Sequence, residues 1–367
     1  MKLLATCFVI NADVGITLED ALHINSFNHF RAIAILLIVA GHSFGVTGLE
    51  IDSIVEKVVV NLIQGGTALF VFISGFLFHY IFYPKFKYSK FVLGKVKNVL
   101  VPYLVLGFLP VFLYVYMKKD VFGDYFLPNG TGLFYEYVIP ALKYYASGRF
   151  LTAYWYIPFI MLVFISSPLH VYFIKVRLKY KLGVIVAMSI VSMVIHRPIA
   201  NIFVLQSLIY YTPIYLIGIT ASIYRDKIYD YLNGKEVYMI FLAIVIALLQ
   251  VNIGVVGNYH KEAFEISSID LMYIQKILLC FFFMILLNRF EDYNNKYIHA
   301  IASTSFTVFF IHPFLIWFTV KLNLPFLNNN SWFIWCIYVV FVSLFCILIA
   351  KAFKKFIPKY SRYIIGY

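Results

Sequence analysis

Long apolar stretches separated by short polar segments are the dominant pattern of this chain. A transmembrane helix needs about 20 predominantly apolar residues. The stretches that meet this requirement predict membrane-spanning helices over residues 27–46, 58–81, 99–117, 153–174, 182–199, 203–222, 236–256, 267–287, 300–320 and 332–353. The pattern therefore predicts an all-α, polytopic integral membrane protein with about ten transmembrane helices, formed by residues 26–367.

Composition excludes the soluble classes of protein. Hydrophobic residues make up 62% of the 367 residues and charged residues 13%, against about 45–50% and about 25% in an average soluble chain. This excludes a disordered chain, a secreted disulfide scaffold and a large cytosolic enzyme. Strands of a membrane barrel alternate apolar and polar residues, which the continuous apolar runs 99–116 and 236–251 do not. The four cysteines have no metal-like spacing, so neither a zinc site nor a disulfide framework is expected.

Two segments outside the predicted spans stand out. Residues 118–152 form the longest connection, and Gly123, Pro128, Asn129 and Gly130 predict an irregular loop there, with a re-entrant segment as the alternative. Residues 1–25 contain a short apolar run from 3 to 10 followed by polar residues. We interpret them as an amino-terminal cytoplasmic segment, with a targeting peptide as the alternative.

The net charge of +13 is a signal of membrane topology. Most of the 30 lysines and arginines fall on one set of alternating connections, the set that is cytoplasmic if the amino terminus is cytoplasmic. The positive-inside rule then predicts that both termini are cytoplasmic. The basic residues are thus explained by membrane topology and anionic lipid, and a nucleic-acid partner is not expected.

The first predicted span carries two ionisable residues, Arg31 and His42, eleven positions apart. At 100° per residue they are about 20° from three whole turns, so they lie on one stripe of the helix, about 16 Å apart along its axis. Ionisable side chains are costly in a bilayer, which favours a stripe that lines a polar cavity. The alternatives are a snorkelling arginine that sets topology and a neutral imidazole bonded to a neighbouring helix. Histidine is suited to general-base chemistry near neutral pH.

Other predicted spans also contain polar residues, namely Asn61, Gln64, Ser74, Lys276, Ser305 and His312. The glycines at 65 and 66 permit close helix contact or an unwound turn. Ser305 and His312 share a helix face, and Pro313 predicts a kink beside them. Lys276 has no carboxylate at ion-pair spacing in its own helix, so it either pairs with another part of the bundle or binds an anion.

Five segments in order resemble membrane-bound acyltransferase family 3, the bacterial enzymes that O-acylate surface glycans. The first is FRAIAILLIVAGH at 30–42, which has the arginine, ten intervening residues and histidine of that family. The others are FVFISGFL at 70–77, a basic segment ending in Pro-Tyr at 95–103, Tyr-Trp-Tyr at 154–156 and SFTVFFIH at 305–312. The resemblance covers residues 26–353, although relatives often carry arginines in the basic segment where this chain has lysines.

The resemblance implies an acyl-CoA-dependent O-acyltransferase of the bacterial inner membrane. It implies transfer of an acyl group, most often acetyl, from cytoplasmic acetyl-CoA to a hydroxyl of a cell-surface polysaccharide or its lipid-linked precursor, without a metal. His42 would be the general base and Arg31 would hold the donor. Residues expected to bind the CoA phosphates are Lys85, Lys87, Lys90, Lys95 and Lys97. Residues expected to orient the substrates are Asn61, Gln64, Ser74, Trp155, Lys276, Ser305 and His312. The alternatives are an exporter or flippase of polysaccharide or lipid-linked sugar without acyl transfer, and a non-catalytic scaffold.

Overall fold

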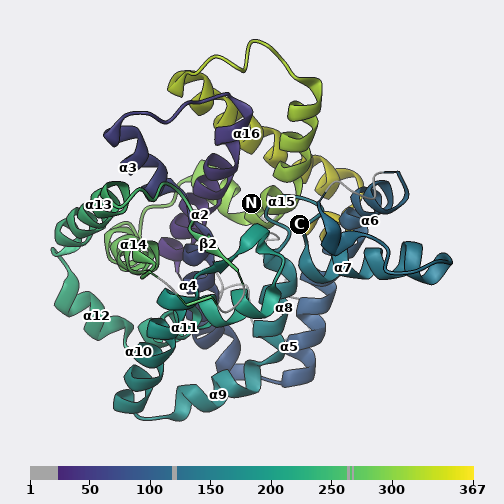
Figure 1. Cartoon of the computed structure of the whole chain (residues 1–367). Helices are drawn as coiled ribbons and strands as arrows, with labels where there is room; N and C mark the ends of the chain where they lie inside the picture. Colours follow the sequence, from purple (N-terminus) through teal and green to yellow (C-terminus); the bar gives the residue numbers. More distant parts are fainter. Residues whose placement is uncertain (1–23, 118–121, 263–264, 267) are drawn as a thin grey trace.

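A computed structural model describes residues 24–117, 122–262, 265–266 and 268–367, drawn in Figure 1. Nearly all of the predicted amino-terminal segment therefore lies outside the described residues. The helices are α2 (Asn25–Ser43), α3 (Ile54–Ile63), α4 (Thr67–Leu77), α5 (Tyr88–Lys95), α6 (Val101–Tyr116), α7 (Ile139–Ser147), α8 (Tyr156–Ile165), α9 (Ser167–Lys175), α10 (Leu178–Ile195), α11 (Val204–Ile223), α12 (Arg225–Leu232), α13 (Glu236–Asn252), α14 (Leu271–Asn288), α15 (Lys296–Leu322), α16 (Trp332–Phe356) and α17 (Ser361–Ile365).

The remaining regular elements are short. Single 3₁₀ turns cover Phe44–Val46, Tyr83–Lys85, Asp124–Phe126 and Ile199–Asn201, and π-helical turns cover Phe78–Phe82, Val96–Leu100 and Phe134–Val138. The described residues contain one parallel pair of two-residue strands, β1 (Arg197–Pro198) and β2 (His260–Lys261). The predicted all-α class is confirmed.

The number of spans also agrees with the sequence. Among the described residues, eight helices are long and apolar enough to cross a membrane, and two bent helix pairs bring the total to as many as ten. The prediction of one uninterrupted helix over 153–174 is wrong, because α8 and α9 meet at a bend of 55°. Ser166 caps the end of α8 there, and Pro168 lies in the first turn of α9, where its missing N–H costs nothing. The predicted span 236–256 ends early, at Asn252 of α13.

The second predicted span is interrupted at its glycines. Helix α3 ends at Ile63 and α4 begins at Thr67, and Gly65 between them has a φ of +78°. Such a φ is readily available only to glycine. Lys276 of α14 donates to the carbonyls of Asn61 and Leu62, both at 2.9 Å, and so satisfies carbonyls that the end of α3 leaves without helical partners. The unwound turn allowed by the glycines is confirmed.

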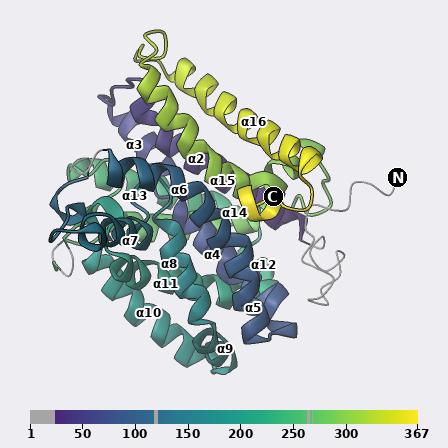
Figure 2. The same cartoon turned by 90° about the vertical axis from the view of Figure 1, so that its right-hand side faces the viewer.

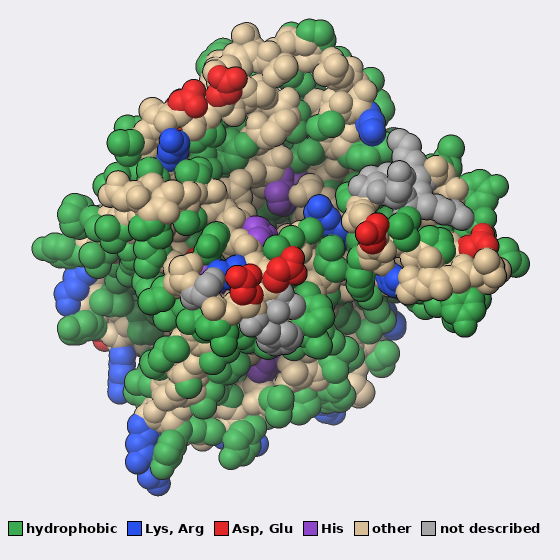
Figure 3. Space-filling view, viewed as in Figure 1, with side chains coloured by type: hydrophobic (Ala, Val, Ile, Leu, Met, Phe, Trp, Pro, Cys, Tyr) green, Lys and Arg blue, Asp and Glu red, His purple; other side chains and the backbone are tan. Residues whose placement is uncertain are grey.

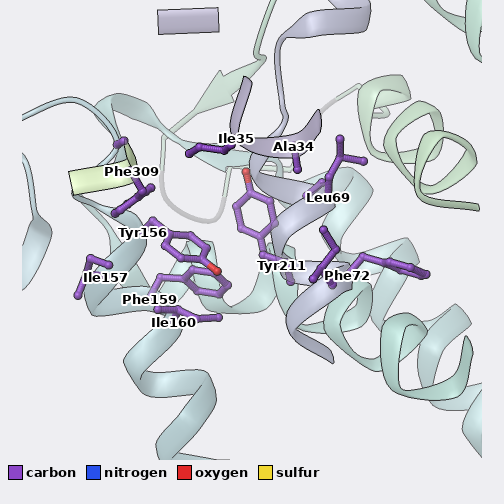
Figure 4. Packing of buried hydrophobic residues seen from close by; sticks show 14 of the residues in the cluster. Ala34, Ile35, Leu69, Phe72, Tyr156, Ile157, Phe159, Ile160, Tyr211 and Phe309 are labelled. Atoms are coloured by element: carbon purple, nitrogen blue, oxygen red, sulfur yellow. The ribbon is translucent and has the colours of Figure 1, made fainter. Parts of the chain in front are cut away.

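Helices α4 and α11 pack with their backbones in direct contact. A Cβ atom on Gly75 would lie 2.0 Å from the Tyr215 carbonyl oxygen, and one on Gly218 would lie 2.2 Å from the Phe72 carbonyl oxygen. Only glycine allows this approach, which is a common device where helices meet in a bilayer. Aromatic residues from α8, α11 and α15 fill the space beside this pair, as Figure 4 shows for Tyr156 and Tyr211.

The prediction of an irregular loop over the whole of 118–152 is wrong in part. The π-helical turn and α7 occupy residues 134–147, and α7 packs against α6. Tyr103 of α6 donates to the carbonyl of Tyr145 at 2.7 Å, and the Tyr145 hydroxyl donates to the carbonyl of Leu104 at 3.1 Å. Gly148 ends α7 in the left-handed conformation that commonly terminates helices. The glycines and proline that suggested an irregular loop lie before this helix.

The two ends of the bundle carry different connections (Figures 1 and 2). The connections α2–α3, α6–α7, α7–α8, α10–α11, α13–α14 and α15–α16 gather at one end, which we call the His42 end. The opposite end, with the connections α4–α5, α9–α10, α14–α15 and α16–α17, is called the Arg31 end. Between them, exposed apolar side chains cover the outer faces of α6, α10, α13 and α16. An apolar surface of this extent indicates contact with lipid.

Candidate active site

His42 and His312 form a hydrogen-bonded pair between α2 and α15. Nδ1 of His42 lies 3.0 Å from Nε2 of His312, and the two rings are coplanar within 4°. His312 is fully buried, and its Nδ1 lies 2.7 Å from the Val308 carbonyl oxygen one turn earlier in α15. Pro313, which has no N–H, follows His312 directly and leaves the Phe309 carbonyl beside this ring without its helical donor.

This chain of contacts determines the tautomer of both rings. The Val308 carbonyl can only accept, so in a neutral His312 ring Nδ1 carries the proton and Nε2 presents its lone pair. Nε2 of His312 therefore accepts from Nδ1 of His42, which must carry the proton of the His42 ring. The lone pair of His42 is then on Nε2, the nitrogen that the pair does not use. A histidine held in one tautomer with one free lone pair is the arrangement that a general base needs.

His42 lines a cavity of about 180 Å³ at the His42 end of the bundle. Figure 3 looks onto this end and shows histidine side chains in a hollow near its middle, with basic and acidic side chains close by. The cavity wall comes from segments far apart in sequence: residues 37–42, 63–67, 148–155, 197–201 and Asn258. His312 does not line it. His42 thus lies at the wall of the cavity, and His312 lies behind it in the protein interior.

Gln64, on the unwound turn after α3, supports the cavity wall beside His42. Its Nε2 donates to the carbonyl of Gly41 at 3.0 Å, and its Oε1 accepts from Asn258 at 2.8 Å. Because the amide nitrogen bonds to α2 and the amide oxygen bonds to the turn before β2, Gln64 holds these two segments together. It belongs to the site as part of its frame.

Trp155 and two arginines form the side of the cavity opposite α3. Trp155 is buried, and the guanidinium carbon of Arg197 lies 5.4 Å from its ring centroid. Arg149 follows the left-handed Gly148 directly, and its guanidinium lies 5.3 Å from the Phe122 ring. The sequence analysis singled out neither arginine as a site residue. For Arg197 the available signal was an arginine followed by Pro198 at the outer end of a predicted span, where the positive-inside rule disfavours basic residues.

Arg31 lies at the other end of α2 and does not line this cavity. It is half-buried, and it lies within electrostatic range of Lys95, as does Arg362 of α17. Lys95 also packs on three aromatic rings, with Nζ 4.3 Å from the ring centroid of Phe82. Burial lowers the pKa of Arg362. The helix stripe therefore connects two separate polar environments, and Arg362 is a member of the cationic group that sequence reasoning missed.

The other predicted donor-binding residues lie around this cationic group. Lys85, Lys87, Lys90 and Lys97 are exposed at the start of the α5–α6 span, at the Arg31 end of the bundle. They form a basic rim next to the half-buried Lys95.

Besides His312, four of the predicted orienting residues lie away from the cavity wall. Asn61 is fully buried, and its side chain holds the turn before β2 by bonds to the backbone of Val255 and Gly257 at 3.1 and 2.6 Å. Lys276 holds the end of α3, as described above. Ser74 of α4 faces the hydroxyl of Tyr156, and Ser305 is buried seven residues before His312. The structure thus uses Asn61 and Lys276 to build the frame of the site.

A protein-family model described as an acyltransferase domain matches residues 24–351. The chain belongs to membrane-bound acyltransferase family 3. The match includes Arg31 and both histidines of the pair, whereas Arg362 lies beyond its last residue. Comparisons with curated proteins and with solved structures give no match.

The acyltransferase is a multi-span membrane protein. The residues that carry the family resemblance lie in different parts of the candidate site. Among the described residues there is no group of three or more His, Cys, Asp or Glu side chains that could hold a metal ion. The described cysteines, Cys280, Cys336 and Cys346, are free thiols. The ionisable side chains among the described residues that line the cavity are His42, Arg149 and Arg197.

Proposed function

We propose that the protein transfers an acyl group, most often acetyl, from a cytoplasmic acyl-CoA to a hydroxyl of a cell-surface polysaccharide or its lipid-linked precursor. The observation that carries this proposal is the His42–His312 pair, whose contacts assign the free lone pair of His42 to Nε2, together with the position of His42 at the wall of a cavity. The bacterial inner membrane, with both termini cytoplasmic, is the setting that the charge pattern and the family favour.

The cationic group at the Arg31 end supports an acyl-CoA as the donor. The phosphates of CoA carry several negative charges, and Arg31, Lys95, Arg362 and the exposed rim lysines supply positive charge at one end of the bundle. Arg31 and His42 are about 16 Å apart along the helix axis. The flexible pantetheine arm of CoA would cover this separation, with its phosphates at Arg31 and its thioester at His42.

The proposed reaction is a direct transfer. Nε2 of His42 takes the proton of the acceptor hydroxyl as its oxygen attacks the thioester carbonyl carbon. A C–O bond forms, the C–S bond breaks, and the leaving CoA sulfur takes the proton back from His42. Nδ1 of His42 stays hydrogen-bonded to His312 throughout, which keeps the ring orientation fixed.

The experiment uses the purified protein in liposomes with acetyl-CoA labelled in the acetyl group. Wild-type protein is expected to release label from CoA, with the label appearing in added glycan or, more slowly, as acetate. His42→Ala is expected to lose this activity while reaching the membrane at normal levels. Release of label by His42→Ala at the wild-type rate would show that His42 is not the base. If folded wild-type protein releases no label from any acyl-CoA, the proposal is contradicted. Movement of labelled lipid-linked sugar across the same liposomes without transfer would identify an exporter or flippase.

A further inference from the structure

Arg197 is a buried cation whose hydrogen-bonding groups are not all used by the protein. Its side chain lines the His42 cavity, yet the residue is only 4% exposed. Nε and Nη1 of its guanidinium are buried without a hydrogen-bond partner. The group packs on the rings of Trp155 and Tyr211, with its central carbon 5.4 and 5.8 Å from the two centroids, and it also hydrogen-bonds to the Tyr211 hydroxyl. Ring contacts replace only part of the hydration that a buried guanidinium loses.

The local backbone holds Arg197 in this position. It begins β1, where it pairs with His260 of β2, and His196 before it has a φ of +60°. Asp270, just before α14, carries a carboxylate near Arg197, but this carboxylate bonds to other groups. Its oxygens accept from the Tyr210 hydroxyl at 2.8 Å and from the Met272 amide at 2.9 Å. Within the described residues, Arg197 forms no ion pair at salt-bridge distance.

Arg149 brings a second guanidinium to the same cavity wall. Burial, followed by the charges of Arg197 and Arg149, keeps the pKa of His260 near 4, so this histidine is neutral at pH 7. The described residues that line the cavity include no aspartate or glutamate. Two guanidiniums therefore line one cavity, and the described part of its wall has no carboxylate that pairs with them.

We propose that the acceptor carries an anionic oxygen group, a carboxylate or a phosphate, which Arg197 and Arg149 bind in the His42 cavity. A planar guanidinium with unused N–H groups matches the two oxygens of such a group. Binding the anion beside His42 selects which hydroxyl of the acceptor approaches Nε2. The substrate class is thus an acidic glycan or a phosphorylated glycan precursor. This inference rests on the proposed function, because it names the acceptor of the same reaction.

One test needs neither acyl donor nor turnover, so it is independent of the proposed function. A buried arginine whose partner is a ligand lowers the folding stability of the ligand-free protein. A buried arginine whose partners are in the protein raises it. Arg197→Gln is expected to leave the melting temperature of the purified, ligand-free protein unchanged or higher. Arg177→Gln, at an exposed position between α9 and α10, is the matched control. A melting temperature several degrees below both wild type and the control would show that Arg197 is structural and would overturn the proposal.

Binding is measured by tryptophan fluorescence, because Trp155 lies against Arg197. The probes are glucuronate for a carboxylate, glucose 1-phosphate for a phosphate, and glucose as the neutral sugar. One of the two anionic sugars is expected to change the emission at concentrations where glucose does not, and the stronger probe identifies the source of the anion. Arg197→Gln and Trp155→Phe should each abolish the change, and Arg197→Lys should keep part of it. Equal responses to all three sugars, or no response to either anion, would contradict the proposal.

Transfer assays then distinguish acceptor binding from a direct role in the chemistry. If Arg197 binds the acceptor anion, Arg197→Gln should lower transfer to an acidic acceptor by about 30-fold or more, and hydrolysis of acetyl-CoA by water should persist. If Arg197 instead stabilises the charge that forms on the thioester oxygen, transfer to acidic acceptors, neutral acceptors and water should fall together. That second result would overturn the proposal.

Discussion

His312 offers the sharpest test of the geometry, because it would act on the reaction only through His42. His312→Leu removes the acceptor of the His42 Nδ1–H bond, now 3.0 Å long, and leaves that N–H buried without a partner in the bundle. Losing the partner of a buried donor costs about 1–3 kcal/mol. If all of this free energy is lost from the His42 tautomer that acts as base, transfer slows by roughly 5- to 150-fold. His42→Ala removes the base itself, which is worth about 10²- to 10⁴-fold.

The assay is a double-mutant cycle on labelled acetyl transfer in liposomes. Because His312 would act through His42, the double variant should be no slower than His42→Ala alone. The KM for acetyl-CoA should change little in His312→Leu, since the proposed site for the donor phosphates is at the Arg31 end. His170→Leu is the matched control, because His170 is also buried but lies on α9 against Phe78 and Tyr215. Wild-type rates in His312→Leu, or losses that multiply in the double variant, would refute the reasoning.

Three further predictions concern other parts of the molecule. Arg31→Ala should raise the KM for acetyl-CoA by about tenfold or more with a smaller change in kcat, and unchanged dependence on acetyl-CoA would contradict its role. Gly218→Ala should lower thermal stability by about 1–3 kcal/mol, because its Cβ would lie 2.2 Å from the Phe72 carbonyl oxygen. Gly183→Ala, where a Cβ meets nothing within 4 Å, is the control and should leave the melting temperature in place. His260 takes up a proton below about pH 6.5 only when the protein unfolds, since its folded pKa is about 4. Stability should therefore fall as the pH is lowered from about 6.5 towards 4, and His260→Gln should reduce that fall in a series of melting curves. If the melting temperatures of wild type and His260→Gln fall equally as the pH is lowered, the pKa shift of His260 is contradicted.

The helices were predictable because hydrophobic length is sufficient to identify a spanning segment. The interruptions were predictable only where glycine or proline had a local reason to break a helix, as at Gly65. The bend between α8 and α9 was missed although Pro168 lies beside it. The reason is that an apolar run of sufficient length was interpreted as one helix. The α7 segment was missed because it is too short to span a bilayer and follows several turn-forming residues.

The site was only partly predictable, because its central contact joins residues 270 positions apart. Periodicity placed Arg31 and His42 on one stripe, but it could not show that the cavity reaches only His42. His312 was assigned a role in orienting substrate, whereas the structure places it behind His42. Arg197 could not be recognised as a site residue, because its position depends on the pairing of β1 with β2, which no local pattern predicts. Of the two roles that the sequence left open for Lys276, the structure shows pairing within the bundle, with the carbonyls at the end of α3.

The protonation state of the His42 ring tests the central claim most directly. Nitrogen-15 NMR of histidine-labelled protein in lipid, at pH 7 without substrates, distinguishes protonated from unprotonated ring nitrogens, and spectra of His42→Ala and His312→Ala assign the two rings. We predict a neutral His42 ring with the proton on Nδ1 and the lone pair on Nε2, and loss of that single tautomer in His312→Ala. A His42 ring protonated on Nε2, or one unaffected by His312→Ala, would contradict the account.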